Sequence, residues 1–337
     1  MNKESFLVIG SNCFSGSHFV QGALSKGFNV YGISRSDIPN QAFFPINWKK
    51  RKEETLNGKF FFFKINLNHQ LDELIEIIDQ YMPTYIVNFA AQGMVAESWL
   101  DPTHWYQTNV VAQVALHDQL RKRKFIKKYV HVTTPEVYGS IDEGWIKEID
   151  SFNPTTPYAV SRAACDLHLK SFFKAYEFPV VFTRSANVYG PGQQLYRVIP
   201  RAILSARTGK LFELHGGGNS NRSFIHIDDV VSATLKIAFD AEPGTTWHIS
   251  TKEAISIRKL VETICKLTSV NFESIVRLTE DRLGKDQNYL LESSSIRNKF
   301  NWCDQISLEE GLLGTIDWVD SNLEYLKQLP WNYIHKK

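Results

Sequence analysis

Hydrophobic residues in the first half of the chain form short runs that alternate with amphipathic stretches. The run Phe6–Ile9 ends at a glycine, which is the pattern of a strand buried in a parallel sheet. Similar runs predict strands at residues 29–34, 59–65, 85–89 and 129–133, with helices at 18–26 and 71–81. Strands that alternate with helices predict an α/β fold with a doubly wound parallel sheet. Ligands are then expected at the carboxyl ends of the strands.

The pattern loosens after about Ala186, where loops rich in glycine, asparagine and proline appear. A strand-like segment, Ser223–Ile227, and a helix over 230–239 are expected to return to the sheet. Helices over 257–267 and 307–326 predict a smaller lobe. We therefore expect a first domain of residues 1–185 plus about 222–250, and a smaller, discontinuous C-terminal lobe of about 186–221 plus 251–337.

Composition narrows the class of protein. The 337 residues are 43% apolar and 22% charged, with a net charge of +2, so no nucleic-acid partner is expected. No apolar run is long enough to span a bilayer, and the N-terminus has no signal-peptide pattern. We therefore expect a cytoplasmic protein with no membrane partner. The four cysteines form no CxxC pair, so neither a disulfide framework nor a metal site is predicted.

The first strand leads into a loop with a glycine at each end, Gly10 to Gly16, and then into a helix. This is the setting of the Rossmann dinucleotide fingerprint, in which Gly10 permits a tight turn and Gly16 permits close packing of the helix. The middle position, usually glycine, is Cys13. An ordinary turn between a strand and a helix would also explain the glycine pair. The candidate cofactor residues of this loop are Gly10, Asn12, Cys13, Phe14, Ser15 and Gly16.

The end of the second strand bears on the choice of cofactor. NAD enzymes usually carry an acid there to hold the ribose hydroxyls, whereas this chain has Ser34 and Arg35. An acid would repel a 2′-phosphate, and arginine and serine can bind one. We therefore favour NADP over NAD, with an exposed turn arginine as the alternative reading.

Three further segments occur in a familiar order. They are Thr133–Gly139 after the fifth strand, Tyr158–Arg162, and Arg184–Pro191 after the next strand. Together they resemble the extended short-chain dehydrogenase/reductases, most closely the nucleotide-sugar 4,6-dehydratases, and the resemblance covers nearly the whole chain. It implies a tightly bound, recycled NAD(P) and adds cofactor contacts at Asn66, Leu67, Ala90, Ala91, Gln92, Asn109, Thr133, Tyr158 and Arg162.

The resemblance also assigns catalytic roles. A 4,6-dehydratase oxidises the sugar at C4, removes the C5 proton, loses water from C6 and returns the hydride to C6. Tyr158 fills the place of the base for the 4-hydroxyl, provided that a nearby cation lowers its pKa. Glu136 fills the place of the base at C5, and Thr134 would orient the 4-oxygen.

Two positions depart from the family pattern. Arg162 stands where the family usually has the lysine that holds the nicotinamide ribose and lowers the tyrosine pKa. Pro135 stands where many 4,6-dehydratases carry an aspartic acid that protonates the leaving hydroxyl. Relatives of the GDP-mannose type lack this aspartate, which implies that Glu136 serves as both base and acid.

The second lobe is expected to hold a nucleoside-diphosphate hexose. The resemblance implies substrate contacts at Asn187, Arg197, Arg201, Arg222, Arg282 and Tyr289. It also implies a homodimer that pairs helices over about 102–121 and 158–175. Neither the base nor the hexose follows from the sequence.

Two other functions remain open from the sequence. The first is an epimerase or a uronate decarboxylase of the same fold. Glu136 argues mildly against a 4-epimerase, because that reaction needs no base at C5. A catalytically silent NADP(H)-binding protein is the other, and it rests only on Arg162 and Pro135.

Overall fold

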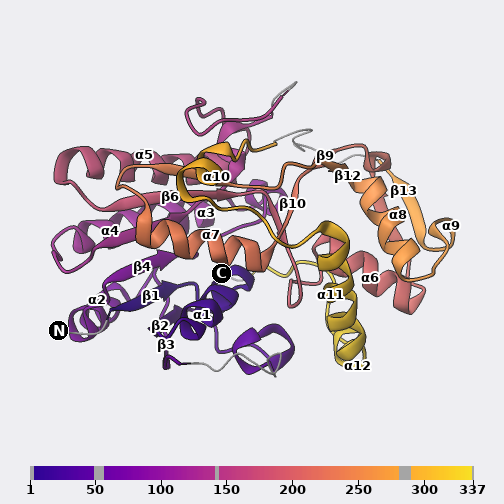
Figure 1. The fold of residues 1–337 in the computed structure, drawn as a ribbon, viewed down its shortest axis with the longest axis horizontal. Helices are drawn as coiled ribbons and strands as arrows, with labels where there is room; N and C mark the ends of the chain where they lie inside the picture. The colour runs from indigo at the N-terminus through magenta and orange to yellow at the C-terminus, as the bar shows by residue number, and fades with distance from the viewer. Residues whose placement is uncertain (1–3, 49–56, 141–143, 281–289, 336–337) are drawn as a thin grey trace.

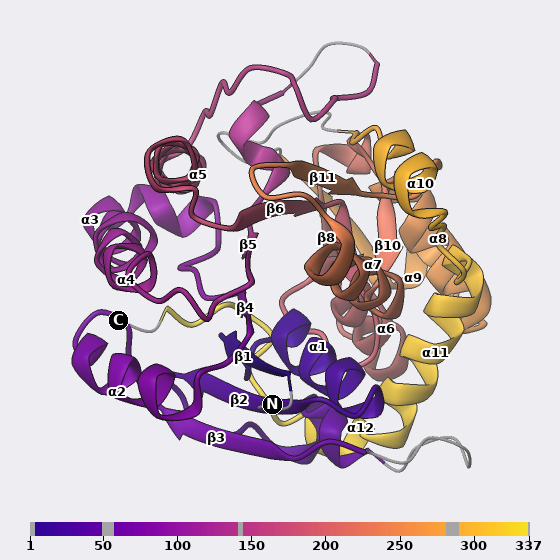
Figure 2. The same ribbon diagram turned by 60° about the vertical axis from the view of Figure 1, so that its left-hand side comes forward.

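The structure is a computed structural model that describes residues 4–48, 57–140, 144–280 and 290–335. A parallel sheet of seven strands lies in the left-hand part of Figure 1, and its order β3-β2-β1-β4-β5-β6-β11 can be followed in Figure 2. The strands are β1 (Ser5–Ile9), β2 (Asn29–Ser34), β3 (Phe60–Lys64), β4 (Tyr85–Asn88), β5 (Lys128–Val132), β6 (Val180–Ser185) and β11 (Thr246–Ile249). The doubly wound sheet expected from the sequence is confirmed.

Helices cover both faces of the sheet, because alternate residues of each strand point to opposite sides. In β1, Phe6 and Val8 pack with helices on one face, and Leu7 and Ile9 pack with helices on the other. The first face carries α1 (Phe14–Ser25), α7 (Ile227–Asp240) and α10 (Ser294–Phe300), and the second carries α2 (Leu71–Tyr81), α4 (Ala112–Leu120) and α5 (Pro157–Tyr176) (Figure 2).

The helix expected over 102–121 is interrupted by a π-helical turn. It consists of α3 (Pro102–Tyr106), the π turn η4 (Gln107–Val111) and α4. Asn109 lies in the π turn and is fully buried. Such single turns are frequent at functional sites, since one extra residue re-aims the side chains around it.

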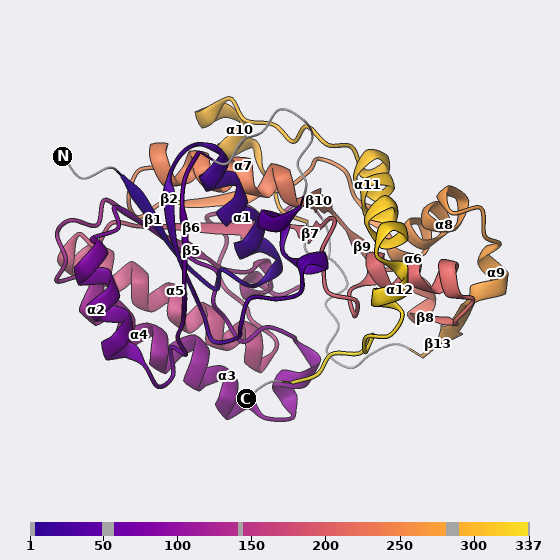
Figure 3. The ribbon, with the colours of Figure 1, turned by 90° about the horizontal axis from the view of Figure 1, so that it is seen from below.

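A second lobe lies beyond the carboxyl ends of the strands and has its own core (Figure 3). Its core is formed largely by α6, α8 and α11, with β8 beside them. The helices are α6 (Val198–Thr208), α8 (Ile257–Leu267), α9 (Phe272–Ile275), α11 (Leu308–Ser321) and α12 (Leu323–Leu326); the strand pairs are β7 (Asn187–Tyr189) with β10 (Phe224–His226), β8 (Phe212–His215) with β13 (Val276–Thr279), and β9 (Asn221–Arg222) with β12 (Ile255–Ser256).

Short turns complete the described elements. The 3₁₀ turns are η1 (Gln41–Phe43), η2 (Pro45–Asn47), η3 (Ala96–Trp99), η5 (Pro135–Tyr138) and η6 (Gly216–Gly218). None of the helices in the described ranges combines the length and the apolar composition needed to cross a membrane.

Three of the expected elements are corrected. The strand expected at 223–227 does not return to the large sheet, because β10 pairs with β7, which continues beyond the end of β6. The seventh strand is instead β11. Helix α1 begins at Phe14, four residues before the expected start, because Cys13 caps it. The helix expected over 307–326 is broken at Asn322 into α11 and α12. The exact division into two domains stays a prediction.

Candidate active site

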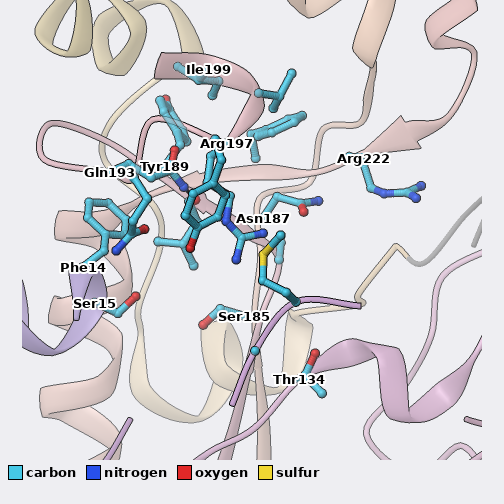
Figure 4. A pocket seen from close by; sticks show the side chains of 18 of the residues that line it. Phe14, Ser15, Thr134, Ser185, Asn187, Tyr189, Gln193, Arg197, Ile199 and Arg222 are labelled. Carbon is cyan, nitrogen blue, oxygen red and sulfur yellow. The ribbon is translucent and has the colours of Figure 1, made fainter. Parts of the chain in front are cut away.

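Two adjoining cavities lie at the carboxyl ends of the strands. The larger, of about 910 Å³, is a cleft between the sheet and the second lobe (Figure 4). The smaller, of about 400 Å³, lies between the ends of β1, β2 and β4. Cys13, Arg35, Ala91 and Gln92 line both cavities, so the two form one continuous candidate site. Volumes of this size suit small-molecule ligands and cofactors.

The loop between β1 and α1 has the backbone that a dinucleotide fingerprint requires. Gly10 has φ +85°, and a Cβ there would lie 2.9 Å from the amide nitrogen of Ala90. A Cβ on Gly16 would lie 2.2 Å from the carbonyl oxygen of Gly10. Cys13 has φ −76°, which any residue adopts, and its Sγ accepts a hydrogen bond from the Gly16 amide at 3.3 Å. Cysteine can therefore replace the usual middle glycine without backbone strain.

The N-terminus of α1 faces the site. Phe14 and Ser15 line the cleft and Asn12 lines the smaller cavity, while Cys13 borders both. The first turn of α1 carries no acidic residue. A helix N-terminus without a carboxylate attracts anions, so these residues fit the diphosphate of a dinucleotide.

The smaller cavity gathers the other candidate cofactor residues. Arg35 follows β2, and its Nη2 donates to Oε1 of Gln92 at 3.3 Å. Asn109 lies behind Gln92: its Oδ1 accepts from the Gln92 amide at 2.7 Å, and its Nδ2 donates to the Gln92 carbonyl at 3.0 Å. Asn109 therefore supports the cavity wall. The predicted residues that line the smaller cavity are Gly10, Asn12, Cys13, Ser34, Arg35, Asn66, Leu67, Ala90, Ala91 and Gln92.

The candidate catalytic residues meet on one wall of the cleft. Thr134, Glu136 and Tyr158 all line it, together with Thr133 at the end of β5. Thr134 caps η5 by accepting from the Glu136 amide at 3.4 Å, and it also hydrogen-bonds the Tyr158 side chain. Pro135 occupies the first position of η5 and fixes the backbone between Thr134 and Glu136. One turn thus places an acid and a hydroxyl beside the tyrosine.

The pKa of Tyr158 is raised, contrary to the lowering that the mechanism calls for. Burial raises it most, and the nearby Glu136 carboxylate adds to this. The Arg162 charge, the Thr134 hydrogen bond and the Arg197 charge act in the opposite direction. The ligand-free chain therefore holds the Tyr158 proton, and two arginines oppose that tendency.

Arg162 lies behind the catalytic wall. Its side chain is 2% exposed, and among the described residues it is not one of those that line the cleft. One guanidinium nitrogen donates to the Val132 carbonyl at the end of β5, whereas Nε and Nη1 have no hydrogen-bond partner. The lysine-like contact with a nicotinamide ribose, expected from the resemblance, therefore stays a prediction.

A buried charge network lies beside Arg162, one turn further along α5. Asp166 accepts from Nη2 of Arg184 at 2.6 Å and from Oγ1 of Thr133 at 3.1 Å, and His131 Nε2 lies 3.4 Å from its other oxygen. Burial raises the Asp166 pKa, but the charges of Arg184 and Arg162 and the contact with His131 outweigh it and lower the pKa to about 2. Asp166 is thus a carboxylate at neutral pH and ties α5 to β5 and β6.

One group of metal-ligating side chains occurs in the part of the chain that the structure describes. His117, His131 and Cys165 each offer a ligand atom within 4.8 Å of the others. All three are buried, and none of them lines the cleft. The group therefore lies outside the candidate active site.

The opposite wall of the cleft carries cations. Arg197, Arg201, Arg222 and Asn187 line it, and Arg197 projects into its middle (Figure 4). Two predicted substrate residues, Arg282 and Tyr289, lie outside the described residues. The sequence reasoning did not identify Asn332 and Tyr333, which also line the cleft. No local motif marks them, since a segment far along the chain brings them there.

Comparison with known proteins supports the family expected from the motifs. The family model described as GDP-mannose 4,6 dehydratase matches residues 7–315. A trifunctional UDP-glucose 4,6-dehydratase/3,5-epimerase/reductase of Arabidopsis thaliana is 29% identical over 96% of this chain and 48% of its own length. The chain spans about half or less of the length of such plant relatives: 48% of this one, and 36% of each of two others from the same plant.

Shorter relatives match over more of their length. The dTDP-D-glucose 4,6-dehydratase of Mus musculus is 32% identical over 72% of this chain and 69% of that protein. The crystal structure of dTDP-glucose 4,6-dehydratase from Streptomyces venezuelae, with NAD and TYD bound, has 27% identity and a TM-score of 0.86, covering 95% of this chain and 98% of that one. The chain belongs to the NAD(P)-dependent nucleotide-sugar 4,6-dehydratase family of extended short-chain dehydrogenase/reductases.

Proposed function

We propose that this chain catalyses the 4,6-dehydration of a nucleoside-diphosphate hexose to the 4-keto-6-deoxy sugar nucleotide. The observation that carries the proposal is the make-up of one cleft. Thr134, Glu136 and Tyr158 line one wall, and the N-terminus of α1 adjoins them. Arginines from the second lobe line the other wall, where the diphosphate of a sugar nucleotide would find its counter-charges.

The first step is removal of the 4-hydroxyl proton. Tyr158 takes this proton as the phenolate, the form that the charges of Arg162 and Arg197 favour. Thr134, which hydrogen-bonds the Tyr158 side chain, orients the tyrosine and the 4-oxygen. When bound, the dinucleotide would supply the group that accepts the C4 hydride and later returns it to C6. Because the chain regenerates that group in each turnover, the dinucleotide can stay bound.

Glu136 acts at the neighbouring carbons. The C4 ketone acidifies the C5 proton, and the carboxylate takes it. The same proton then passes to the C6 hydroxyl, which leaves as water. When the hydride has returned to C6, C5 takes a proton from solvent, and this balances the 4-hydroxyl proton that Tyr158 removed and returns to solvent. Pro135 cannot donate a proton, so Glu136 serves as both base and acid. The net change is loss of one water molecule, with the C4 hydrogen moved to C6.

The alternatives predict different products. An epimerase inverts a carbon without loss of water, and a uronate decarboxylase releases carbon dioxide. Glu136 beside Thr134 and Tyr158 favours dehydration over epimerisation at C4, which uses no base at C5. A silent binding protein would leave every sugar nucleotide unchanged.

The proposal is tested by incubating the protein with NADP and NAD against nucleotide hexoses that differ in base and sugar, followed by proton NMR. The expected result is a C6 methyl doublet with one member of the panel, and none with a Tyr158→Phe variant. Conversion without a methyl signal would establish one of the rival reactions instead. Unchanged substrates in the presence of bound dinucleotide would overturn the proposal.

NADP is the proposed cofactor, although the Streptomyces relative holds NAD. Arg35 lines both cavities, and the next acid, Asp37, is engaged by Lys64 at 2.8 Å. An Arg35→Ala variant should lose about tenfold or more in affinity for NADP and little for NAD, since one charge-assisted contact to the 2′-phosphate is removed. Calorimetric titration with both dinucleotides measures this; equal losses for the two would contradict the assignment.

A homodimer is proposed through the outer faces of α3, η4, α4 and α5. Val111 and Leu167 are more than half exposed there, and Tyr106 and Val160 are exposed beside them. An apolar surface of this kind on two neighbouring helices supports isologous pairing. Sedimentation velocity distinguishes a dimer from a monomer.

A further inference from the structure

The segment after α12 returns from the second lobe to the first domain. In Figure 3 its yellow trace runs from α12 toward α3. At the lobe end, Nη1 of Arg201 donates to the Trp331 carbonyl at 3.1 Å and to Oδ1 of Asn332 at 2.9 Å. The Lys210 ammonium lies 4.5 Å from the centre of the Trp331 ring. Arg201 of α6 and Lys210, just after the end of α6, thus hold the start of the segment against the second lobe.

The far end of the segment is fixed on α3. Nε2 of His335 lies 2.8 Å from Nδ1 of His104, a hydrogen-bond distance. The His335 ring also stacks on Trp105, with ring centres 5.0 Å apart and planes at 8°. Residues 331–335, which we name the strap, therefore connect the two lobes, and Asn332 and Tyr333 among them line the cleft.

The middle of the strap is held by Gln92. Nε2 of Gln92 lies 3.0 Å from the Tyr333 hydroxyl and 3.2 Å from Nδ1 of His335, and Oε1 accepts from Arg35. The Gln92 residue is 3% exposed and lines both cavities. A chain of contacts thus runs from the end of β2 through Gln92 to the strap, over the junction of the two cavities.

A dinucleotide has two nucleotide halves, and its ends must occupy both cavities. We propose that Tyr333 and His335 of the strap are part of the cofactor site and, through Gln92, slow the release of the bound dinucleotide. The proposal rests on the proposed function for its purpose: a reaction that regenerates its cofactor in every turnover loses nothing when the cofactor rarely leaves.

The test measures dinucleotide release without any sugar nucleotide. The full chain is loaded with NADPH, and its fluorescence is followed after addition of excess NADP. A Tyr333→Phe/His335→Ala variant should release NADPH about tenfold faster, since it loses two contacts to Gln92 and the contacts of His335 with His104 and Trp105. The matched control is Ile334→Ala, because Ile334 lies between the two residues and is 61% exposed. It should release NADPH at the wild-type rate.

A double-mutant cycle tests whether Gln92 carries the effect. The Tyr333→Phe substitution should accelerate release when Gln92 is present, and should cause no further acceleration in a Gln92→Ala background. Release from the double variant at the wild-type rate, with an unchanged unfolding temperature, would overturn the proposal. So would an acceleration that persists without Gln92, or an altered KM for the sugar nucleotide with normal NADPH release. If the strap proposal is overturned, the proposed dehydration is unaffected, because it is tested separately by the product that forms.

Discussion

At the scale of single residues, Arg162 acts on Tyr158 through its charge, although its side chain does not line the cleft where the cofactor would bind. Its guanidinium is buried behind the wall that carries Tyr158, yet its charge opposes the rise in the Tyr158 pKa that burial and Glu136 cause. A lysine at this position in the family combines the charge with a cofactor contact. In this chain the charge alone is evident, and Arg197 adds a second charge from the cleft side.

Replacing Arg162 with methionine should therefore raise the Tyr158 pKa further. A base with a higher pKa is deprotonated to a smaller extent at neutral pH, so kcat should fall about tenfold or more and recover toward alkaline pH. Arg162→Lys keeps the charge and should retain the wild-type pH profile. The measurement is kcat from pH 6 to 10; a loss of activity in Arg162→Met without displacement of the profile would show a structural role only.

At the scale of elements, Asp166 joins α5 to the sheet through Arg184 and Thr133. Its pKa of about 2 lies below the ordinary 3.8, so folding favours the carboxylate. The resulting stability is complete above pH 4 and is lost as the pH falls through 2. The same helix carries Tyr158 and Arg162, so this link also fixes the catalytic wall.

An Asp166→Asn variant should be less stable by about 3 kcal/mol at pH 7, because Arg184 then remains buried without its counter-charge. The variant should also lose the part of the acid sensitivity that Asp166 contributes. Urea unfolding at several values between pH 3 and 7 gives both quantities. Equal stability of the two proteins at pH 7 would contradict the assigned role.

Elements with a strong local signal could be predicted from the sequence. The strand at 29–34 and the helices at 71–81 and 257–267 have the predicted bounds, since apolar periodicity decides them. The strand partner of residues 223–227 could not be predicted in this way, because pairing with β7 depends on contacts between residues far apart in the sequence. The π turn at Asn109 also lacks a local breaker.

At the scale of the whole molecule, the site is the boundary between two hydrophobic cores. One core underlies the sheet and its fingerprint loop, and the other underlies the arginine wall. The motifs placed Tyr158, Glu136 and the fingerprint loop in one site, which the structure also brings together. Tyr333 escaped prediction because its place depends on the path of the strap between the lobes.

The central claim is that hydrogen moves from C4 to C6 within one active site. The most direct measurement uses the sugar nucleotide that the chain converts, labelled with deuterium at C4, and locates the label in the product by NMR. We expect deuterium in the C6 methyl group. Deuterium retained at C4 of an inverted sugar, or released to water, would contradict it.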